Sequence, residues 1–175
     1  MTTMTLALAG NPNCGKSTIF NNLTGARQHI GNYPGVTVEK REGYVKHEGK
    51  KLLVCDLPGT YNLTARSPDE LAARKFIIEE KPDAVLNIVD AGNLERNLYL
   101  TLQLLELERP MVLALNMADA LEKNRISLDD AGLAAKLGVT VVRTVGNRHK
   151  GTEKLLAAAL QAQRSSFNLS YDAEV

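Results

Sequence analysis

The residues from Gly10 to Ser17, GNPNCGKS, fit the phosphate-binding pattern G-x-x-x-x-G-K-[ST]. Backbone N–H groups of such a loop wrap a β-phosphate, and the following helix start adds partial positive charge. Lys16 reaches the β- and γ-phosphate oxygens, and the Ser17 hydroxyl is a ligand for Mg²⁺. A glycine-rich turn without ligand is the alternative. The predicted phosphate-binding residues of the loop are Asn11, Asn13, Cys14, Gly15, Lys16, Ser17 and Thr18.

A second phosphate-side pattern is Asp56-Leu57-Pro58-Gly59, which follows a strand-like run. Asp56 at a strand end would hold Mg²⁺ through water. The Gly59 amide would contact a γ-phosphate, because glycine lets the backbone come close. A plain Asp-Pro-Gly turn is the alternative, and the position after the first loop favours the nucleotide interpretation.

The run Asn116-Met117-Ala118-Asp119 fits N-[KM]-x-D and follows another apolar run. The Asp119 carboxylate can accept hydrogen bonds from guanine N1–H and the 2-amino group. Adenine offers neither donor, so a buried carboxylate would stay unpaired and discriminate strongly. Asn116 would connect this loop to the phosphate loop and touch the base, together with Met117. A helix cap is the alternative role of Asp119.

Thr37 ends the segment Pro34-Gly35-Val36-Thr37 just as a strand begins. A threonine there can place its hydroxyl on Mg²⁺ when a γ-phosphate is present and withdraw after hydrolysis. We therefore assign Thr37 to the metal and Gly35 to the phosphate. The segments 27–37 and 59–67 are the predicted mobile switches.

Strand and helix patterns alternate along the chain, which predicts a doubly wound α/β domain with its ligand site at the carboxyl ends of the strands. The strands are short and apolar, as in a parallel sheet covered on both faces. One hairpin adds a single antiparallel edge strand. The six predicted strands are 6–9, 36–46, 51–56, 84–89, 111–115 and 139–142; the helices are 16–24, 68–80, 94–107, 127–137, with Ser127 as N-cap, and 152–164; residues 27–35 form a loop.

The composition is that of an ordinary globular domain of 175 residues with a net charge of +1. Nothing in it favours nucleic acid as a partner, and no apolar run is long enough to span a membrane. The start of the chain is too polar for a signal peptide, so we expect a soluble intracellular chain with Cys14 and Cys55 as thiols. Residues 1–164 are the predicted nucleotide-binding domain, and residues 165–175 read as a linker or the start of a truncated helical domain.

Four stretches together resemble the N-terminal G domain of FeoB, the prokaryotic ferrous iron transporter: GNPNCGKSTIFNNLTG, HIGNYPGVTVEKREG, DLPGTYNL and NMAD. The resemblance implies a Ras-like P-loop GTPase fold, GTP and GDP as ligands, and helical and transmembrane domains in the same full-length chain. It implies a place at the cytoplasmic face of the cell membrane. It also implies that Asn13 is a K⁺ ligand beside the phosphates, where a cation would offset transition-state charge.

Two departures from commoner GTPases bear on mechanism. Thr60 stands where Ras-type enzymes carry a water-orienting glutamine, which predicts slow turnover with Lys16, Asn13, Thr37 and Gly59 as the catalytic set. The usual Ser-Ala-Lys guanine loop is replaced here, and the predicted O6-contacting residues are Val145, Gly146 and Asn147.

The sequence thus predicts a slow, K⁺-assisted GTPase switch that regulates ferrous iron uptake by the membrane part of a transporter. Two alternatives stay open: a free-standing GTPase that acts in RNA modification or ribosome assembly, and a nucleotide-sensing module with negligible catalysis. The near-neutral charge counts against the first alternative. Oligomeric state stays open, with a homo-oligomer of the full-length protein as one option.

Overall fold

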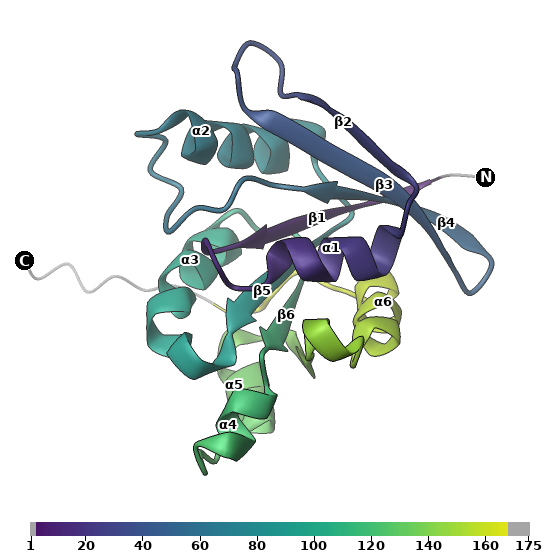
Figure 1. The fold of residues 1–175 in the computed structure, drawn as a ribbon. Helices are drawn as coiled ribbons and strands as arrows, with labels where there is room; N and C mark the ends of the chain where they lie inside the picture. Colours follow the sequence, from purple (N-terminus) through teal and green to yellow (C-terminus); the bar gives the residue numbers. More distant parts are fainter. Residues whose placement is uncertain (1–2, 168–175) are drawn as a thin grey trace, which may run out of the picture.

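A seven-stranded sheet forms the centre of the computed structural model, which describes residues 3–167 (Figure 1). Its strand order is β2-β3-β4-β1-β5-β6-β7. The strands β1, β4, β5, β6 and β7 pair in parallel, whereas β3 pairs antiparallel with both β4 and β2. The strand bounds are β1 Met4–Gly10, β2 Gln28–Asn32, β3 Glu39–His47, β4 Lys50–Asp56, β5 Ala84–Asp90, β6 Met111–Asn116 and β7 Thr140–Arg143.

Helices cover both faces of this sheet (Figure 1), as the uniformly apolar strands predict. Alternate residues of β1 point to opposite faces: Leu6 and Leu8 pack with α1 and α6, while Ala7 and Ala9 pack with α2, α3 and α5. The helix bounds are α1 Lys16–Thr24, α2 Pro68–Lys75, α3 Leu94–Glu106, α4 Asp119–Lys123, α5 Asp130–Leu137 and α6 Thr152–Leu160. The doubly wound architecture predicted from the sequence is confirmed.

The strand count differs from the prediction of six, because β2 lies inside the predicted loop 27–35. Its five residues are half-buried or exposed and include Gly31, so they carry no apolar alternation. The strand exists because β3 presents a free edge, and the two strands pair from Gln28 to Asn32. The hairpin prediction itself is confirmed, with β3 and β4 joined at Glu48-Gly49.

Several helix bounds also differ. The short helix α4 was not predicted, and α5 begins at Asp130, because Asp129 rather than Ser127 is the N-cap and accepts from the Gly132 N–H at 2.9 Å. The predicted helix 68–80 is α2 followed by a π-helical turn, Phe76–Glu80. The predicted helix 152–164 ends at Leu160.

The carboxyl ends of the parallel strands meet at one edge of the sheet. There β1 ends at Gly10, and its neighbour β4 ends at Asp56, which lies opposite Leu8. On its other side, β1 pairs with β5, and β5 pairs with β6. At the ends of these two strands, Asp90 of β5 lies opposite Asn116 of β6. The three sequence patterns therefore begin side by side, as predicted for a ligand site at this edge.

The predicted tail 165–175 is described only as far as residue 167. The Ser165 hydroxyl donates to the carbonyl oxygen of Leu137 at 2.6 Å, so the chain still contacts α5 at this point. The rest of the tail lies outside the described residues, and the boundary at residue 164 stays a prediction. Between residues 3 and 167, no helix combines the length and apolarity that crossing a bilayer requires.

Candidate functional site

The loop between β1 and α1 is folded by two left-handed backbone positions, Asn13 with φ of 65° and Gly15 with φ of 86°. Glycine adopts this region without a Cβ penalty, and asparagine tolerates it better than most residues. A Cβ on Gly15 would also overlap the side-chain amide of Asn116. Of the two residues, the phosphate-binding pattern requires only Gly15, and Asn13 occupies one of its variable positions.

Lys16 and Asp56 form a buried ion pair between the start of α1 and the end of β4. Their side chains are 10% and 7% exposed. The pair brings the predicted phosphate-binding amine and the predicted metal-binding carboxylate together. Each charge lowers the cost of burying the other at the sheet edge.

Ser17 follows Lys16 and is exposed at the mouth of the loop. Its hydroxyl and the Asp56 carboxylate are oxygen donors of the kind that Mg²⁺ prefers. No group of three His, Cys, Asp or Glu side chains that could hold a metal occurs in residues 3–167. The donors fit a Mg²⁺ ion that takes most of its ligands from water and a bound phosphate.

The predicted γ-phosphate residue Gly59 packs on the loop itself. A Cβ at Gly59 would lie 3.4 Å from the backbone of Pro12, which is ordinary van der Waals contact, so Gly59 lies directly against the loop. The next residue, Thr60, donates its N–H to the Gly10 carbonyl oxygen at 3.2 Å and is 5% exposed. These contacts fix the start of the predicted second switch against the phosphate loop.

A pocket of about 270 Å³ lies over the loop. Asn11 is almost fully buried there, and its side-chain amide donates to the Arg96 carbonyl oxygen at 3.5 Å, so this side chain supports the loop from the α3 side. The predicted phosphate-site residues that line the pocket are Asn11, Asn13, Gly15, Lys16, Ser17, Thr18 and Gly59. Cys14 is buried beneath it.

Gly35 and Thr37 are not among the residues that line this pocket. They line a separate hollow with Tyr33 and Pro68. Tyr33 fixes the segment, since its hydroxyl donates to the Asp56 carbonyl oxygen at 3.1 Å and its N–H to the Val38 carbonyl oxygen at 2.9 Å. The roles of Gly35 and Thr37 stay predictions that require this segment to move toward the loop.

Asn116 connects the second half of the site to the first. Its side-chain N–H donates to the Cys14 carbonyl oxygen at 2.9 Å, and its side-chain oxygen accepts from the Thr144 hydroxyl at 3.0 Å and the Gly146 N–H at 3.1 Å. Asn22 of α1 donates to the Gly146 carbonyl oxygen at 2.8 Å. The predicted connection between the N-x-x-D loop and the phosphate loop is confirmed.

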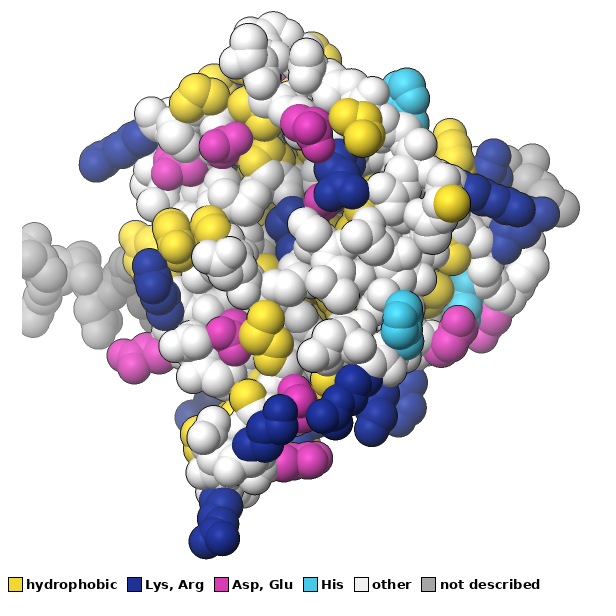
Figure 2. Space-filling view, in the orientation of Figure 1, with side chains coloured by type: hydrophobic (Ala, Val, Ile, Leu, Met, Phe, Trp, Pro, Cys, Tyr) yellow, Lys and Arg dark blue, Asp and Glu magenta, His cyan; other side chains and the backbone are white. Residues whose placement is uncertain are grey.

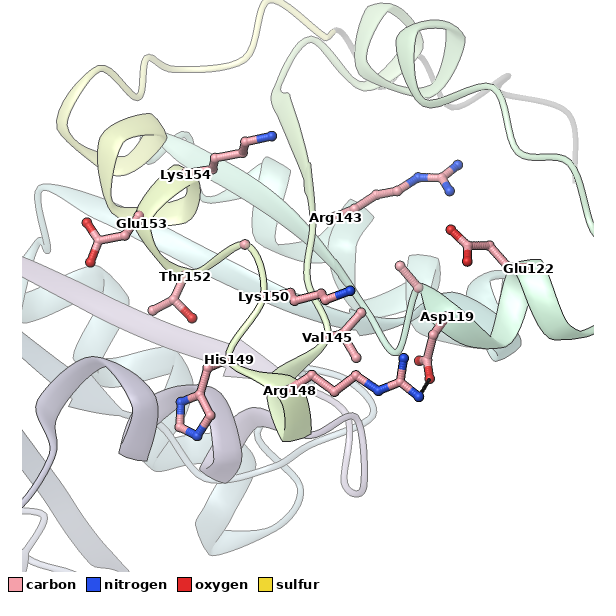
Figure 3. A pocket seen from close by; sticks show the side chains of 12 residues that line it. Asp119, Glu122, Arg143, Val145, Arg148, His149, Lys150, Thr152, Glu153 and Lys154 are labelled. Carbon is pink, nitrogen blue, oxygen red and sulfur yellow. Dashed lines mark ion pairs between the residues drawn. The ribbon is translucent and has the colours of Figure 1, made fainter.

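Asp119 is the first residue of α4, and its side chain is 18% exposed. Its Oδ2 accepts from the Lys123 ammonium at 3.1 Å and lies 3.9 Å from the Arg148 guanidinium (Figure 3). The hydrogen bond from Lys123 is the main cause that lowers the pKa of this carboxyl, and the charges of Lys123 and Arg148 lower it further. The carboxylate is thus ionised and ready to accept hydrogen bonds.

The three predicted guanine O6 residues differ in environment. Val145 and Gly146 are buried, and the Gly146 N–H is already bonded to Asn116. Asn147 is exposed, and its N–H has no partner found within the described part of the chain. Met117 lies beside Gly15. The backbone φ of Met117 is 57°, a left-handed value that is unusual for a residue other than glycine.

Residues 4–159 match the family model described as "Ferrous iron transport protein B". The chain belongs to the FeoB family. A fusion protein of Fe(2+) transport protein A and the Fe(2+) transporter FeoB from Porphyromonas gingivalis is 54% identical over 151 residues, which are 86% of this chain and 18% of that protein. The chain spans about a fifth of the length of the curated FeoB relatives that it matches.

Solved FeoB structures share the fold. The cytosolic domain of the T. maritima FeoB iron transporter in GDP form I superposes with a TM-score of 0.91 at 36% identity, over 98% of this chain and 69% of that one. The FeoB G-domain from Methanococcus jannaschii has a TM-score of 0.81 at 47% identity and covers 92% and 99%. The predicted Ras-like α/β fold is confirmed.

Some residues that hold the candidate site together are not singled out by the sequence. Asn22 and Thr144 hold the predicted guanine-side loop, Tyr33 holds the predicted first switch, and Arg148 faces Asp119. Polar residues next to the motifs were the only signal in the sequence, and such residues are common on surfaces. Their partners lie far along the chain, so only the fold shows which of them matter.

Proposed function

We propose that this chain is a GTP-binding domain that slowly hydrolyses GTP to GDP and phosphate, and that it acts as a switch. The observation that carries the proposal is the hydrogen bond from Asn116 to the Cys14 carbonyl oxygen. It holds the predicted base-recognising loop and the predicted phosphate-binding loop together as one candidate site. GDP-bound FeoB relatives of the same fold support this ligand.

On the phosphate side, the loop N–H groups and Lys16 hold the phosphates. Lys16 would exchange Asp56 for phosphate oxygens, which leaves the Asp56 carboxylate facing the metal. Ser17, Asp56 through water and, after closure of its segment, Thr37 would hold Mg²⁺. When bound, Mg²⁺ supplies charge neutralisation at the β- and γ-phosphates.

On the base side, Asp119 accepts the N1–H and 2-amino hydrogens of guanine, which adenine lacks. The Asn147 N–H is the available donor for O6, since Gly146 is engaged with Asn116. Asn116 and Met117 border the base. Asp119→Ala should therefore remove the preference for GTP over ATP.

Hydrolysis would rely on backbone and cation groups. Thr60 is buried and tied to Gly10 through its N–H, so its side chain is poorly placed to orient water. The Gly59 N–H would contact the γ-phosphate, and Asn13 would hold K⁺, which supplies positive charge beside the phosphates when bound. This set predicts slow turnover.

For the whole protein we propose the role of its relatives, which are Fe(2+) transporters. Nucleotide turnover in this domain would regulate ferrous iron uptake by transmembrane segments of the same chain, from the cytoplasmic face, through a helical domain after residue 164. A homo-oligomer of the full-length protein is compatible with this arrangement.

The decisive experiment measures phosphate release from GTP, with ATP as control, in K⁺ and Na⁺ buffers of equal ionic strength. We expect GTP to be turned over faster in K⁺, and Asn13→Gly, which keeps the left-handed backbone of the loop, to lose the K⁺ effect. Asn21→Ala, an exposed asparagine of α1, is the matched control and should keep it.

Equal rates for GTP and ATP would contradict the base assignment. Equal slow rates of GTP turnover in both salts would remove Asn13 from the mechanism. The buried Thr60 favours one second candidate, a GTP-dependent binding switch without useful turnover. That candidate predicts tight, guanine-specific binding with no phosphate release above background.

A further inference from the structure

The guanine-recognising carboxylate is already engaged by cations of the protein. Lys123 Nζ and Arg148 Nη2 lie 3.1 Å and 3.9 Å from the same oxygen, Oδ2 of Asp119. Lys123 lies one turn further along α4, whereas Arg148 comes from the loop that would lie at the other edge of the base. Figure 3 shows the guanidinium directed at Asp119 across the gap between these two loops.

The backbone that carries Arg148 is anchored on both sides. Gly146 is bonded through its N–H to Asn116 and through its carbonyl to Asn22. Val145 and Lys150 bridge the base of the loop through two backbone hydrogen bonds of 3.1 and 3.2 Å. The side chain of Arg148 is nevertheless 53% exposed, so it can swing while its backbone stays fixed.

We infer that Arg148 competes with guanine for Asp119 and thereby lowers the affinity of the site for guanine nucleotides. The inference rests on the proposed function, since it assumes that guanine uses Asp119. Guanine needs both oxygens of this carboxylate, and the ion pair at Oδ2 must loosen before the base can settle. Arg148 therefore stabilises the nucleotide-free state and opposes binding.

The surroundings offer Arg148 another position. A pocket of about 440 Å³ adjoins Asp119, with Glu122, Lys150 and Lys154 among the residues that line it. Arg143, in the same pocket, is held by Asp130 at 2.6 and 2.8 Å. Glu122 is thus a carboxylate toward which a displaced Arg148 can turn. The surface shown in Figure 2 has basic and acidic side chains mixed at the end that carries α4.

The expected effect is modest, because exposed ion pairs contribute little. Their usual strength corresponds to a change of about 1.5- to 5-fold in a dissociation constant. Arg148→Gln should therefore tighten GDP binding by roughly two- to five-fold, chiefly through slower GDP release. Arg148→Lys keeps the charge and should stay within about two-fold of the parent chain.

The test measures the dissociation constant of GDP by calorimetry for the parent chain, Arg148→Gln and Arg148→Lys. Arg125→Gln is the matched control, because it removes one exposed charge after α4. In residues 3–167, Arg125 itself has no ion-pair partner. Arg148→Gln is then repeated in an Asp119→Asn background. An ionic-strength series with added choline chloride, with K⁺, nucleotide and Mg²⁺ held constant, provides an independent measurement.

Tighter GDP binding by Arg148→Gln, lost in the Asp119→Asn background and reduced at high salt, supports the inference. Unchanged or weaker binding by Arg148→Gln overturns it, and weaker binding would show that Arg148 contacts the nucleotide. An equal gain in both backgrounds also overturns it. Failure of the parent chain itself to bind GDP contradicts the proposed function, so the two failures are distinguishable.

Discussion

Asn116 donates its side-chain amide to the carbonyl oxygen of Cys14 at 2.9 Å, across 102 residues of sequence. The same side chain accepts from Thr144 and Gly146 and is 2% exposed. One asparagine thus joins three loops that arise from β1, β6 and β7. Both the shape of the site and part of the stability of the sheet edge depend on it.

Asn116→Ala should lower the free energy of unfolding by about 2–3 kcal/mol, because three buried hydrogen-bonding groups lose their partner. Urea unfolding of the nucleotide-free chain measures this loss. Asn124→Ala removes an exposed amide that donates to the Ala120 carbonyl oxygen and should cost much less. Equal losses for the two variants would contradict the bridging role.

Breaking the buried pair of Lys16 and Asp56 should be costly for a different reason. Asp56→Ala leaves an ammonium group buried without its counter-charge, which costs about 3 kcal/mol or more. The double variant with Lys16→Ala should recover part of this loss, because no uncompensated charge remains. Asp69→Ala, an exposed carboxylate in the first turn of α2, serves as control in the same urea titrations.

The two thiols should be unreactive in the folded chain. Burial is the main cause that raises the pKa of Cys14 to about 11 and that of Cys55 to about 12. At pH 8 only about one Cys14 thiol in a thousand is then a thiolate. A disulfide reagent that releases a coloured thiolate should react with neither thiol at pH 8 and with both in denaturant. Rapid reaction of the folded chain would show that the loop opens.

The low reactivity expected of Cys14 concerns its role in the phosphate loop. A thiol at a helix start can have a lowered pKa, and the sequence alone leaves a redox role open. The structure buries Cys14 to 1% exposure. Desolvation therefore exceeds the lowering effect of Lys16 and the backbone, and a small packed residue is the role that the environment favours.

GDP affinity should tolerate acid because the pKa of Asp119 is lowered. Its carboxylate stays ionised at pH values where an unperturbed aspartate, with a pKa near 3.9, is partly protonated. Protonation of Asp119 should therefore contribute no loss of affinity between pH 8 and about pH 5, and should lower affinity only in stronger acid. Binding titrations across this range test the expectation.

Lys123→Gln removes the main cause of the lowered pKa, so the loss of affinity in acid should begin at a higher pH. Lys136→Gln, an exposed lysine at the end of α5, should leave the profile unchanged. Identical acid limbs for both variants would contradict the role of Lys123.

Much of the fold was predictable because the buried strands are short apolar runs and the helices have strong boundaries. The helix predicted to end at residue 137 does end there, with Gly138 in the left-handed region as its C-cap. The edge strand β2 was not predictable, since its pairing with β3 stabilises it and its composition does not. The short helix α4 was missed because its first residue, Asp119, also belongs to the guanine motif.

The site was predictable where a motif fixes both residue type and backbone shape, as at Gly15, Lys16 and Asn116. It was not predictable where geometry decides among similar residues. The sequence gives no reason to choose among Val145, Gly146 and Asn147 as the donor to O6. The structure does, because the Gly146 N–H is already bonded to Asn116. The ion pair of Arg148 and Asp119 likewise joins residues that are 29 positions apart, so only the fold brings them together.

The predicted second switch, residues 59–67, is hydrogen-bonded near both of its ends. Thr60 is bonded to Gly10, while Ser67 and Glu70 close the start of α2, where Glu70 N–H donates to the Ser67 hydroxyl at 3.2 Å. Between these points Tyr61 lies under the Arg96 guanidinium of α3, 4.5 Å from ring centroid to cation. The Leu63 N–H also donates to the Gln103 side-chain oxygen of α3 at 2.7 Å. The span is thus held to α3 at two points, so a displacement that starts at Gly59 would reach α3 directly.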